Sequence, residues 1–418
     1  MAAFQRIKAI SSSLLQHRSD PSELSNQLLL LHTVMSEVRS DLIPLRDYLL
    51  FPLMLILDSV HPSRAAKNQD PPPVTAARSN RVVEATLNCL SLLLHILSLP
   101  KSQDDAHSEL SRIALESHQD RLDQSMELLQ RLMPILSLLS PQAVKGDPQI
   151  ALSDEAAALT LGCISTILTS LPAQSYPGSE EGPFLPLIGF LISTMIQIGG
   201  ATESPSLKLS SLKTLDVIIR VLRVYDAQEG RGGNALAFFL PGIVGGLAKI
   251  LLGLESSSTS SSSLSSCSVA ALKCLTVVLS ASLGDHHASL LLLQNEGSTK
   301  SQSQEDLMTL DEAVSKIKDL ALKASESTAS ISPAPPTIPP SSAASPLSTD
   351  RPSFLITRTK DWLTDSGKKV SPLLMRLLPP LSTHPRASVR SGVASLAASL
   401  LSLPSALMAL GTQGQGES

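Results

Sequence analysis

The stretch Ala270–Ser282, AALKCLTVVLSAS, decides the fold because the chain repeats its pattern. Related stretches occur at Ala85–Leu97 (ATLNCLSLLLHIL), Leu159–Leu171 (LTLGCISTILTSL), Ser210–Leu222 (SSLKTLDVIIRVL) and, more faintly, Ser391–Leu403 (SGVASLAASLLSL). We call these five stretches the copies. Such regular recurrence points to one structural unit that is used several times along the chain.

Three positions define each copy. A first apolar position is occupied by Leu87, Leu161, Leu212, Leu272 and Val393. A second apolar position follows three residues later, at Leu90, Ile164, Leu215, Leu275 and Leu396. Between them lies a small residue, which we call the slot residue: Cys89, Cys163, Thr214, Cys274 and Ser395. This spacing, continued by Leu, Ile and Val, predicts a helix that is buried on more than one side.

A helix of this kind cannot cover its own apolar surface, so the copies are expected to stack as a solenoid. The intervals between them are 74, 51, 60 and 121 residues. Two-helix repeats usually run to about 40–47 residues, so either long insertions separate the helices or one copy is too degenerate to recognise. The predicted fold class is all-α, a HEAT/armadillo-like helical-repeat solenoid with disordered insertions.

The composition agrees with a folded helical chain. Hydrophobic residues make up 43% of the 418 residues and charged residues 17%, which favours folding over disorder. Aromatic residues are scarce at 3%, which suits helix-on-helix packing better than a β-sandwich. The net charge of −4 shows no nucleic-acid footprint over the whole chain. Cys89, Cys163 and Cys274 match the slot, so they are interpreted as small buried hydrophobes rather than disulfide partners.

The predicted organisation has four parts. Residues 1–324 form a HEAT-like solenoid, with a Ser-rich insertion at 256–268 that cannot pack a core. Residues 325–350 are a disordered Ser/Pro-rich linker. Residues 351–405 form a further HEAT-like helix pair, and residues 406–418 are a disordered tail. A Phe beside a Pro recurs in Leu50-Phe51-Pro52, Phe184-Leu185-Pro186 and Phe239-Leu240-Pro241. Since proline is tolerated in the first turn of a helix, this pattern predicts the start of the second helix of each repeat.

The stretch Ala235–Leu254 is apolar for nearly the length of a transmembrane helix. Pro241 and Lys249 interrupt it, and it lies where a second repeat helix is due. A buried solenoid helix is therefore favoured over a membrane span, and the protein is expected to be soluble, without a membrane partner.

No motif for catalysis, cofactor or metal binding is found, and no enzyme is expected. Nucleotide-binding loops and G-x-S-x-G, H-E-x-x-H and C-x-x-C motifs do not occur. Asp285-His286-His287 is the only histidine cluster. It is better explained as a loop in which Asp285 caps the next helix than as a metal site, because adjacent residues on a helix point in different directions.

Two Ser-Gln pairs, at Ser301 and Ser303, lie in a polar loop. They either arise by chance or are regulatory phosphorylation sites, where added negative charge would change how the loop docks.

Several short motifs resemble one family. The segment Arg358-Thr359-Lys360-Asp361-Trp362-Leu363, followed by His384-Pro385 and Val389-Arg390, is similar to a pattern in the TTT-complex subunit family Tel-Two-Interacting Protein One. The stretches YLLFP at Tyr48–Pro52 and FLPGI at Phe239–Ile243 also resemble its N-terminal portion. Members of that family are longer solenoids, so the chain is expected to match the N-terminal part.

The resemblance implies a non-catalytic HEAT-repeat scaffold that joins two other helical-repeat subunits. It also implies that the assembly works with the Hsp90 chaperone system to mature phosphatidylinositol-3-kinase-related kinases, and so affects DNA-damage, telomere and nutrient signalling. The expected location is the cytoplasm, with the nucleus left open.

Two other classes are considered. A generic helical-repeat transport or trafficking adaptor would need a ladder of Asn or Trp along its inner helices, but the chain has a single Trp. An enzyme would need a cluster of perturbed ionisable residues in a cleft. Trp362, His384 and Arg390 are the candidate protein-binding residues, since Trp and Arg are typical interface anchors. Alternatively, they pack and cap the last helix pair.

Overall fold

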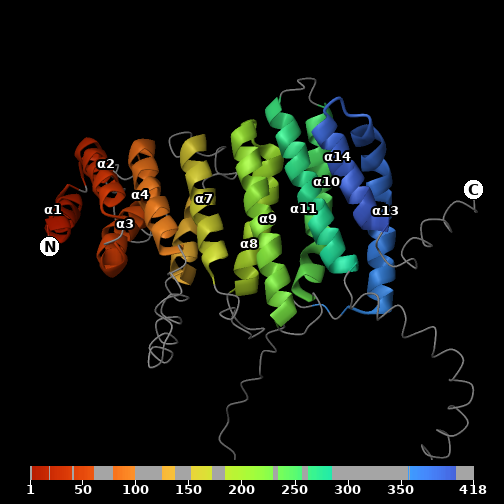
Figure 1. Cartoon of the computed structure of the whole chain (residues 1–418), viewed down its shortest axis with the longest axis horizontal. Coiled ribbons are helices and arrows are strands. Elements are labelled where there is room, and N and C mark those ends of the chain that lie inside the picture. The colour runs from red at the N-terminus through yellow and green to blue at the C-terminus, as the bar shows by residue number, and fades with distance from the viewer. Residues whose placement is uncertain are drawn as a thin grey trace, which may run out of the picture.

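The computed structural model describes residues 2–17, 19–39, 42–60, 79–98, 125–136, 152–171, 184–228, 234–256, 262–284, 356 and 358–401. Throughout these residues the secondary structure is helical, without strands. The elements are α1 (Ala2–Gln16), α2 (Pro21–Glu37), the 3₁₀ turn η2 (Ile43–Leu45), α3 (Arg46–Val60), α4 (Asn80–Ser98), residues 125–136, α7 (Asp154–Ser170), α8 (Phe184–Ala201), α9 (Pro205–Gln228), α10 (Asn234–Ser256), α11 (Ser262–Leu283), α13 (Lys360–Ser382) and α14 (Ala387–Leu401). Figure 1 shows them side by side, in chain order along the long axis of the molecule.

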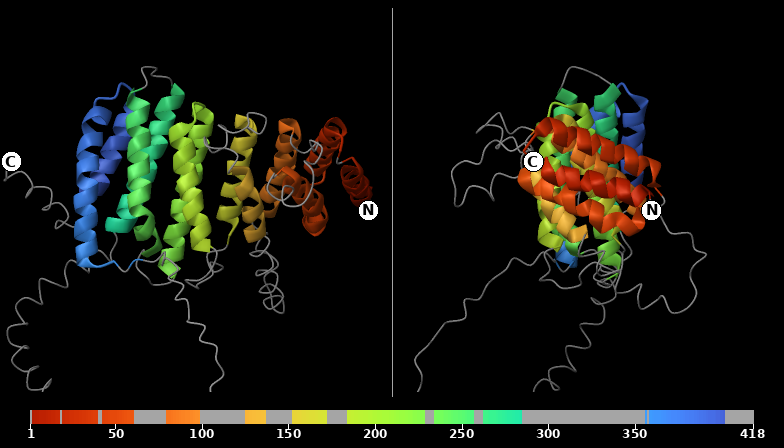
Figure 2. Two further views of the ribbon diagram at one scale, coloured as in Figure 1. Left: turned by 180° about the vertical axis from the view of Figure 1, so that it is seen from behind. Right: turned by 90° about the vertical axis from the view of Figure 1, so that its left-hand side faces the viewer.

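The helices form two layers. In the first layer α2, α4, α7, α9, α11 and α14 each pack against the next. The second layer contains α1 beside α3, and α8, α10 and α13 in succession. Residues 125–136 are joined to α3 by an ion pair between Arg131 and Asp58. The rear view at the left of Figure 2 shows the same succession of helices, and this stacked arrangement confirms the predicted helical-repeat solenoid.

All five copies lie in the first layer, which we call the copy layer. The first and second apolar positions of every copy are buried, because each copy packs against the neighbouring helices of the stack. The long final interval is explained by an insertion and not by an unrecognised copy: α14 packs directly on α11. Between these two helices, α13 belongs to the second layer, and residues 285–355 lie outside the described part of the chain.

The expected role of the Phe-Pro pattern was wrong in two respects. Pro186 does lie in the first turn of α8, but Pro52 and Pro241 lie inside α3 and α10. The start of α10 is fixed upstream by Asp226 of α9, whose two carboxylate oxygens accept the N–H groups of Ala235 and Leu236, both at 3.1 Å. In addition, α8 packs along α9, and α10 packs most closely along α11. Each Phe-Pro helix is therefore the first and not the second member of its pair.

The Ser-rich insertion at 256–268 is also corrected. Helix α11 begins at Ser262, and Ser265, Cys267 and Ser268 are buried within its first turns. Serine is tolerated there because its hydroxyl can bond to the carbonyl one turn earlier, as Ser268 does to Leu264 at 3.3 Å. The linker 325–350 and the tail 406–418 lie outside the described residues.

Helices α8 and α10 approach each other closely through glycines. A Cβ atom at Gly246 would lie within 3.0 Å of three side-chain atoms of Ile196, and one at Gly199 would lie 3.0 Å from Ile250 Cδ1. Each helix thus inserts an isoleucine over a glycine of the other. This reciprocal packing fixes the register of the two helices.

Within the described ranges, three helical segments are long and apolar enough to cross a membrane by length and composition: Phe184–Ala201, Ala235–Leu254 and Ser262–Leu283. In the structure all three take part in the two layers, where α10 contacts α8, α9, α11 and α13. Ala235–Leu254 is therefore a stacked repeat helix, as its sequence predicts. The expected absence of a membrane partner stays a prediction.

Candidate interaction surface

The slot residues form a ladder of hydrogen bonds between neighbouring helices of the copy layer. In three successive steps the slot residue lies within donating distance of the backbone carbonyl at the first apolar position of the preceding copy. The bonds are Cys163 to Leu87 at 3.7 Å, Thr214 to Leu161 at 3.4 Å and Cys274 to Leu212 at 3.4 Å. Because the same two positions meet at each step, neighbouring copies run parallel in one register.

The ladder reveals a further copy that sequence reasoning missed. Cys89 in α4 donates to the carbonyl of Leu28 in α2, at 3.2 Å, so Leu28 holds the first apolar position of α2. Leu31, three residues later, is fully buried as the second apolar position requires. The signal was present in the Leu28–Leu31 spacing. It was obscured because leucine, not a small residue, occupies the slot position at Leu30.

The last copy departs from the ladder. Ser395 is exposed, and Leu272 of α11 is instead covered by Gly392, where a Cβ atom would lie 3.1 Å from Leu272 Cδ1. Val393 and Leu396 are nevertheless buried as predicted. Helix α14 therefore packs on α11 with a different rotation about its axis.

The cysteine thiols donate hydrogen bonds to backbone carbonyls of other helices. All four are free and buried, and burial raises the pKa of Cys89, Cys163 and Cys274 to about 12. At physiological pH these thiols keep the proton that they donate, and they lack the thiolate character that nucleophilic cysteines require. Their burial, predicted from the sequence, is confirmed.

The segment Arg358–Leu363 joins the last helix pair to the rest of the stack. The guanidinium of Arg358 is buried and its Nη1 donates to the carbonyl of Ser282, in the last turn of α11, at 3.1 Å. A cation at this position is favoured by the partial negative charge of a helix C-terminus. Thr359 caps α13 by accepting the N–H of Trp362 at 3.1 Å, and Leu363 is fully buried.

The three candidate protein-binding residues do not form one cluster. Trp362 is half-buried in the first turn of α13 and packs against the core. His384 and Arg390 lie beyond the other end of this 23-residue helix, a distance of about 35 Å. Arg390 is exposed and donates to the carbonyls of His384 and Pro385, at 2.8 and 2.9 Å. In this structure Arg390 therefore stabilises the turn between α13 and α14, and a binding role stays a prediction.

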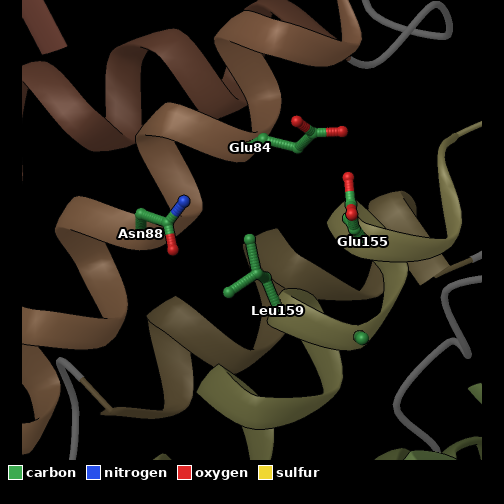
Figure 3. A pocket seen from close by; sticks show the side chains of 5 residues that line it. Glu84, Asn88, Glu155 and Leu159 are labelled. Carbon is green, nitrogen blue, oxygen red and sulfur yellow. The ribbon is translucent and has the colours of Figure 1, made fainter. Parts of the chain in front are cut away.

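A shallow groove of about 440 Å³ lies between α4 and α7. Figure 3 shows Glu84 and Asn88 on α4 opposite Glu155 and Leu159 on α7. Both carboxylates have local roles: Glu84 accepts the hydroxyl of Ser153, the N-cap of α7, and Glu155 lies in the first turn of α7, where negative charge is favoured.

Among the described residues no group of three or more His, Cys, Asp or Glu side chains could hold a metal ion. The Asp285-His286-His287 cluster and the Ser-Gln pairs at Ser301 and Ser303 lie outside the described residues.

Comparison with known proteins gives a family match over nearly the whole chain. The model described as the TTI1 N-terminal TPR domain matches residues 4–410. Two curated relatives are the TELO2-interacting protein 1 homologs of Mus musculus and Homo sapiens, 25% and 24% identical over 218 residues. Each alignment covers 50% of this chain and 16% of the relative. No solved structure is significantly similar.

The family model spans the described helices from α1 to α14. The match includes Arg358 and Arg390, two residues of the motifs that suggested the resemblance. In the structure Arg358 bonds to α11, and Arg390 holds the turn between α13 and α14. The tetratricopeptide of its description is also a two-helix repeat, in agreement with the stacked helix pairs. The chain belongs to the TTI1 N-terminal TPR domain family.

Proposed function

We propose that this protein is a non-catalytic scaffold subunit of a TTT-type co-chaperone complex. The observation that carries the proposal is the family match over residues 4–410, on a chain whose described residues form one stack of helix pairs. Stacks of this kind expose long continuous faces that bind other proteins.

The proposed partners follow from the family. The two relatives are named for their interaction with TELO2, so a TELO2 counterpart is the first proposed partner. The others are a further helical-repeat subunit, the Hsp90 machinery and phosphatidylinositol-3-kinase-related kinases as clients. The proposed location is the cytoplasm, and a second location in the nucleus is left open. Because the relatives are much longer, these assignments are proposals for this chain.

A trafficking adaptor is the alternative. Peptide-gripping adaptors would present repeated Asn or Trp side chains on the exposed face of the copy layer. After the first apolar position, the described copies expose Asn88, Gly162, Lys213, Lys273 and Ala394, so asparagine occurs only once in that row. Trp362 belongs to α13 in the other layer. These positions favour the scaffold.

The test is affinity purification of the tagged 418-residue chain from its native cells, with partners identified by mass spectrometry. We expect recovery of the TELO2 counterpart together with a second helical-repeat subunit and a kinase or Hsp90. The proposal is wrong if a chain shown to be helical by circular dichroism recovers none of them, while the tagged TELO2 counterpart recovers its complex from the same cells. Phosphosite mapping of the same material tests the modification predicted at Ser301 and Ser303.

A further inference from the structure

A group of cations lies on the exposed face of the copy layer, over α9 and α11. Lys213, Arg220 and Arg223 are exposed along one side of α9, and Lys273 is exposed on α11. We call these four residues the basic patch. Lys213 and Lys273 each follow the first apolar position of their copies, so they occupy equivalent places on adjacent parallel helices. Arg220 and Arg223 continue the line, because residues three apart are neighbours on a helix.

One carboxylate organises the patch. Asp216 Oδ2 accepts from Arg220 Nη2 at 2.8 Å and from Lys273 Nζ at 3.2 Å. The Asp216 side chain is only 14% exposed, whereas those of Arg220 and Lys273 are 58% and 56% exposed. The pair Asp216–Lys273 links α9 to α11, so the two exposed faces are contiguous. The carboxylate thus positions two exposed cations, and the four positive charges of the patch exceed its single negative charge.

These two helices carry a net positive charge, whereas the net charge of the whole chain is negative. Together α9 and α11 carry five cations, at Lys208, Lys213, Arg220, Arg223 and Lys273, against two carboxylates, Asp216 and Asp226. Asp226 is buried and binds the N-terminus of α10. The whole chain, by contrast, has a net charge of −4. Positive charge is therefore concentrated on one part of the copy layer.

Beside the patch, the equivalent places on α7 and the remaining one on α11 carry short side chains. At the place equivalent to Lys213 and Lys273, α7 exposes Gly162. At the place equivalent to Arg220, α7 exposes Thr169, and α11 has the partly exposed Ser280. The cations are thus the longest side chains in these two rows of α7, α9 and α11, and a second polypeptide can lie across the face and reach them.

From this arrangement we propose that the basic patch binds an acidic polypeptide segment of a partner protein. From Lys213 to Arg223 the patch extends about 15 Å along α9, and α11 lies about 8–10 Å to the side. Carboxylates spaced over three turns of a helix, or along an extended segment, match this outline. Nucleic acid fits less well, since phosphate-driven binding uses many cations, and here Asp216 neutralises part of a small patch on a net-negative chain.

The inference rests on the proposed scaffold role and assigns that role a surface and a partner chemistry. Its first test uses the purified full chain and two synthetic helical peptides. One peptide carries glutamates at i, i+4 spacing over three turns, and the matched peptide carries glutamines. We expect the glutamate peptide to bind, with an affinity that falls as salt is raised, and the glutamine peptide not to bind. A glutamate peptide that fails to bind, or a duplex DNA oligonucleotide that binds more tightly, would overturn the proposal.

Charge-reversal variants locate the binding. Lys213→Glu combined with Arg223→Glu leaves both partners of Asp216 in place, so it should fold normally. It should weaken peptide binding by at least about tenfold. The matched control is Lys368→Glu combined with Lys369→Glu, two exposed lysines of α13, which should leave the affinity unchanged. Equal weakening by the two double variants would show that only net charge matters and would refute a defined site.

The same variants separate this inference from the scaffold proposal in the affinity purification. If the Lys213→Glu/Arg223→Glu chain recovers its partners as efficiently as the wild type, the basic patch is not the docking surface, while the scaffold role stands. If the wild type recovers no partner, the scaffold proposal fails, and the docking inference, which rests on it, fails as well even where the peptide binds.

Discussion

At the residue scale, the slot residue shows how one side chain aligns two helices. The sequence predicts a small buried residue between two apolar positions, which the structure confirms at Cys89, Cys163, Thr214 and Cys274. The hydrogen bond to the preceding helix adds a directional constraint. Its acceptor is the carbonyl of one particular position on that helix, and only one register of the two helices brings this carbonyl to the donor. A purely apolar residue of the same size would fill the space without this constraint.

Thr214 tests the slot. Its one hydroxyl hydrogen has two acceptors within reach, Leu161 O at 3.4 Å and Ser210 O at 3.0 Å, and the Ser165 hydroxyl lies 3.0 Å away. Thr214→Val keeps the shape but removes the hydroxyl, so we expect the free energy of unfolding to fall by about 1 kcal/mol. Thr214→Cys introduces the residue of the adjacent copies and should cost less. Urea unfolding followed by circular dichroism measures both, and a valine variant as stable as the wild type would show that the bond contributes nothing.

At the element scale, close helix approach explains glycines that the sequence pattern does not. Helix α10 contains Gly242, Gly245, Gly246 and Gly253, but only Gly246 has another side chain in the way of a Cβ atom. At Gly242, Gly245 and Gly253 a Cβ would meet nothing within 4 Å. Four glycines on one helix therefore have different roles, which depend on the side of the helix that faces α8.

This difference predicts effects of opposite sign. Gly246→Ala would press its methyl group against Ile196 and should destabilise the fold by about 1–3 kcal/mol. Gly242→Ala enters open space, and alanine is favoured over glycine in a helix by about 1 kcal/mol, so this variant should be more stable than the wild type. Thermal unfolding of the two variants checks the pair. Stabilisation by Gly246→Ala would mean that α8 and α10 are farther apart than described.

At the scale of the whole molecule, each helix pair depends mainly on its neighbours, as in other repeat proteins. The final pair, α13 and α14, returns to the stack after the insertion and contacts α10 and α11. Arg358 joins this pair to the C-terminal turn of α11 through the carbonyl of Ser282. A buried guanidinium that is bonded across the junction makes the last pair sensitive to a single residue.

Arg358→Met should loosen the last pair selectively. The variant leaves the Ser282 carbonyl without this donor, and such a loss costs about 1–3 kcal/mol. We expect faster amide hydrogen exchange in α13 and α14, with α7 and α8 unchanged. Arg376→Met, at an exposed position of α13, is the matched control and should leave exchange as in the wild type. Uniformly faster exchange across all helices would instead indicate that the stack unfolds as one unit.

Part of this protein follows from local pattern alone. The 3.6-residue periodicity of the copies predicts helices, and their repetition predicts stacking, because a helix that is apolar on several sides requires neighbours. The N-caps of α2 and α7 are Asp20 and Ser153, two residue types that are preferred at this position because their side-chain oxygens accept the first free N–H groups of the helix. These properties depend on residues close together in the chain, so the sequence by itself determined them.

Tertiary structure decided what depends on distant residues. Asp226, not the Phe-Pro pattern, sets the start of α10, because the capping carboxylate comes from another helix. Leu28 is recognised as a copy position only through its bond to Cys89. Likewise, the basic patch exists only because α9 and α11 lie parallel and adjacent, which brings Lys273 to Asp216 across 57 residues of chain. Local periodicity identifies the helices, whereas their pairing, register and shared surfaces depend on three-dimensional packing.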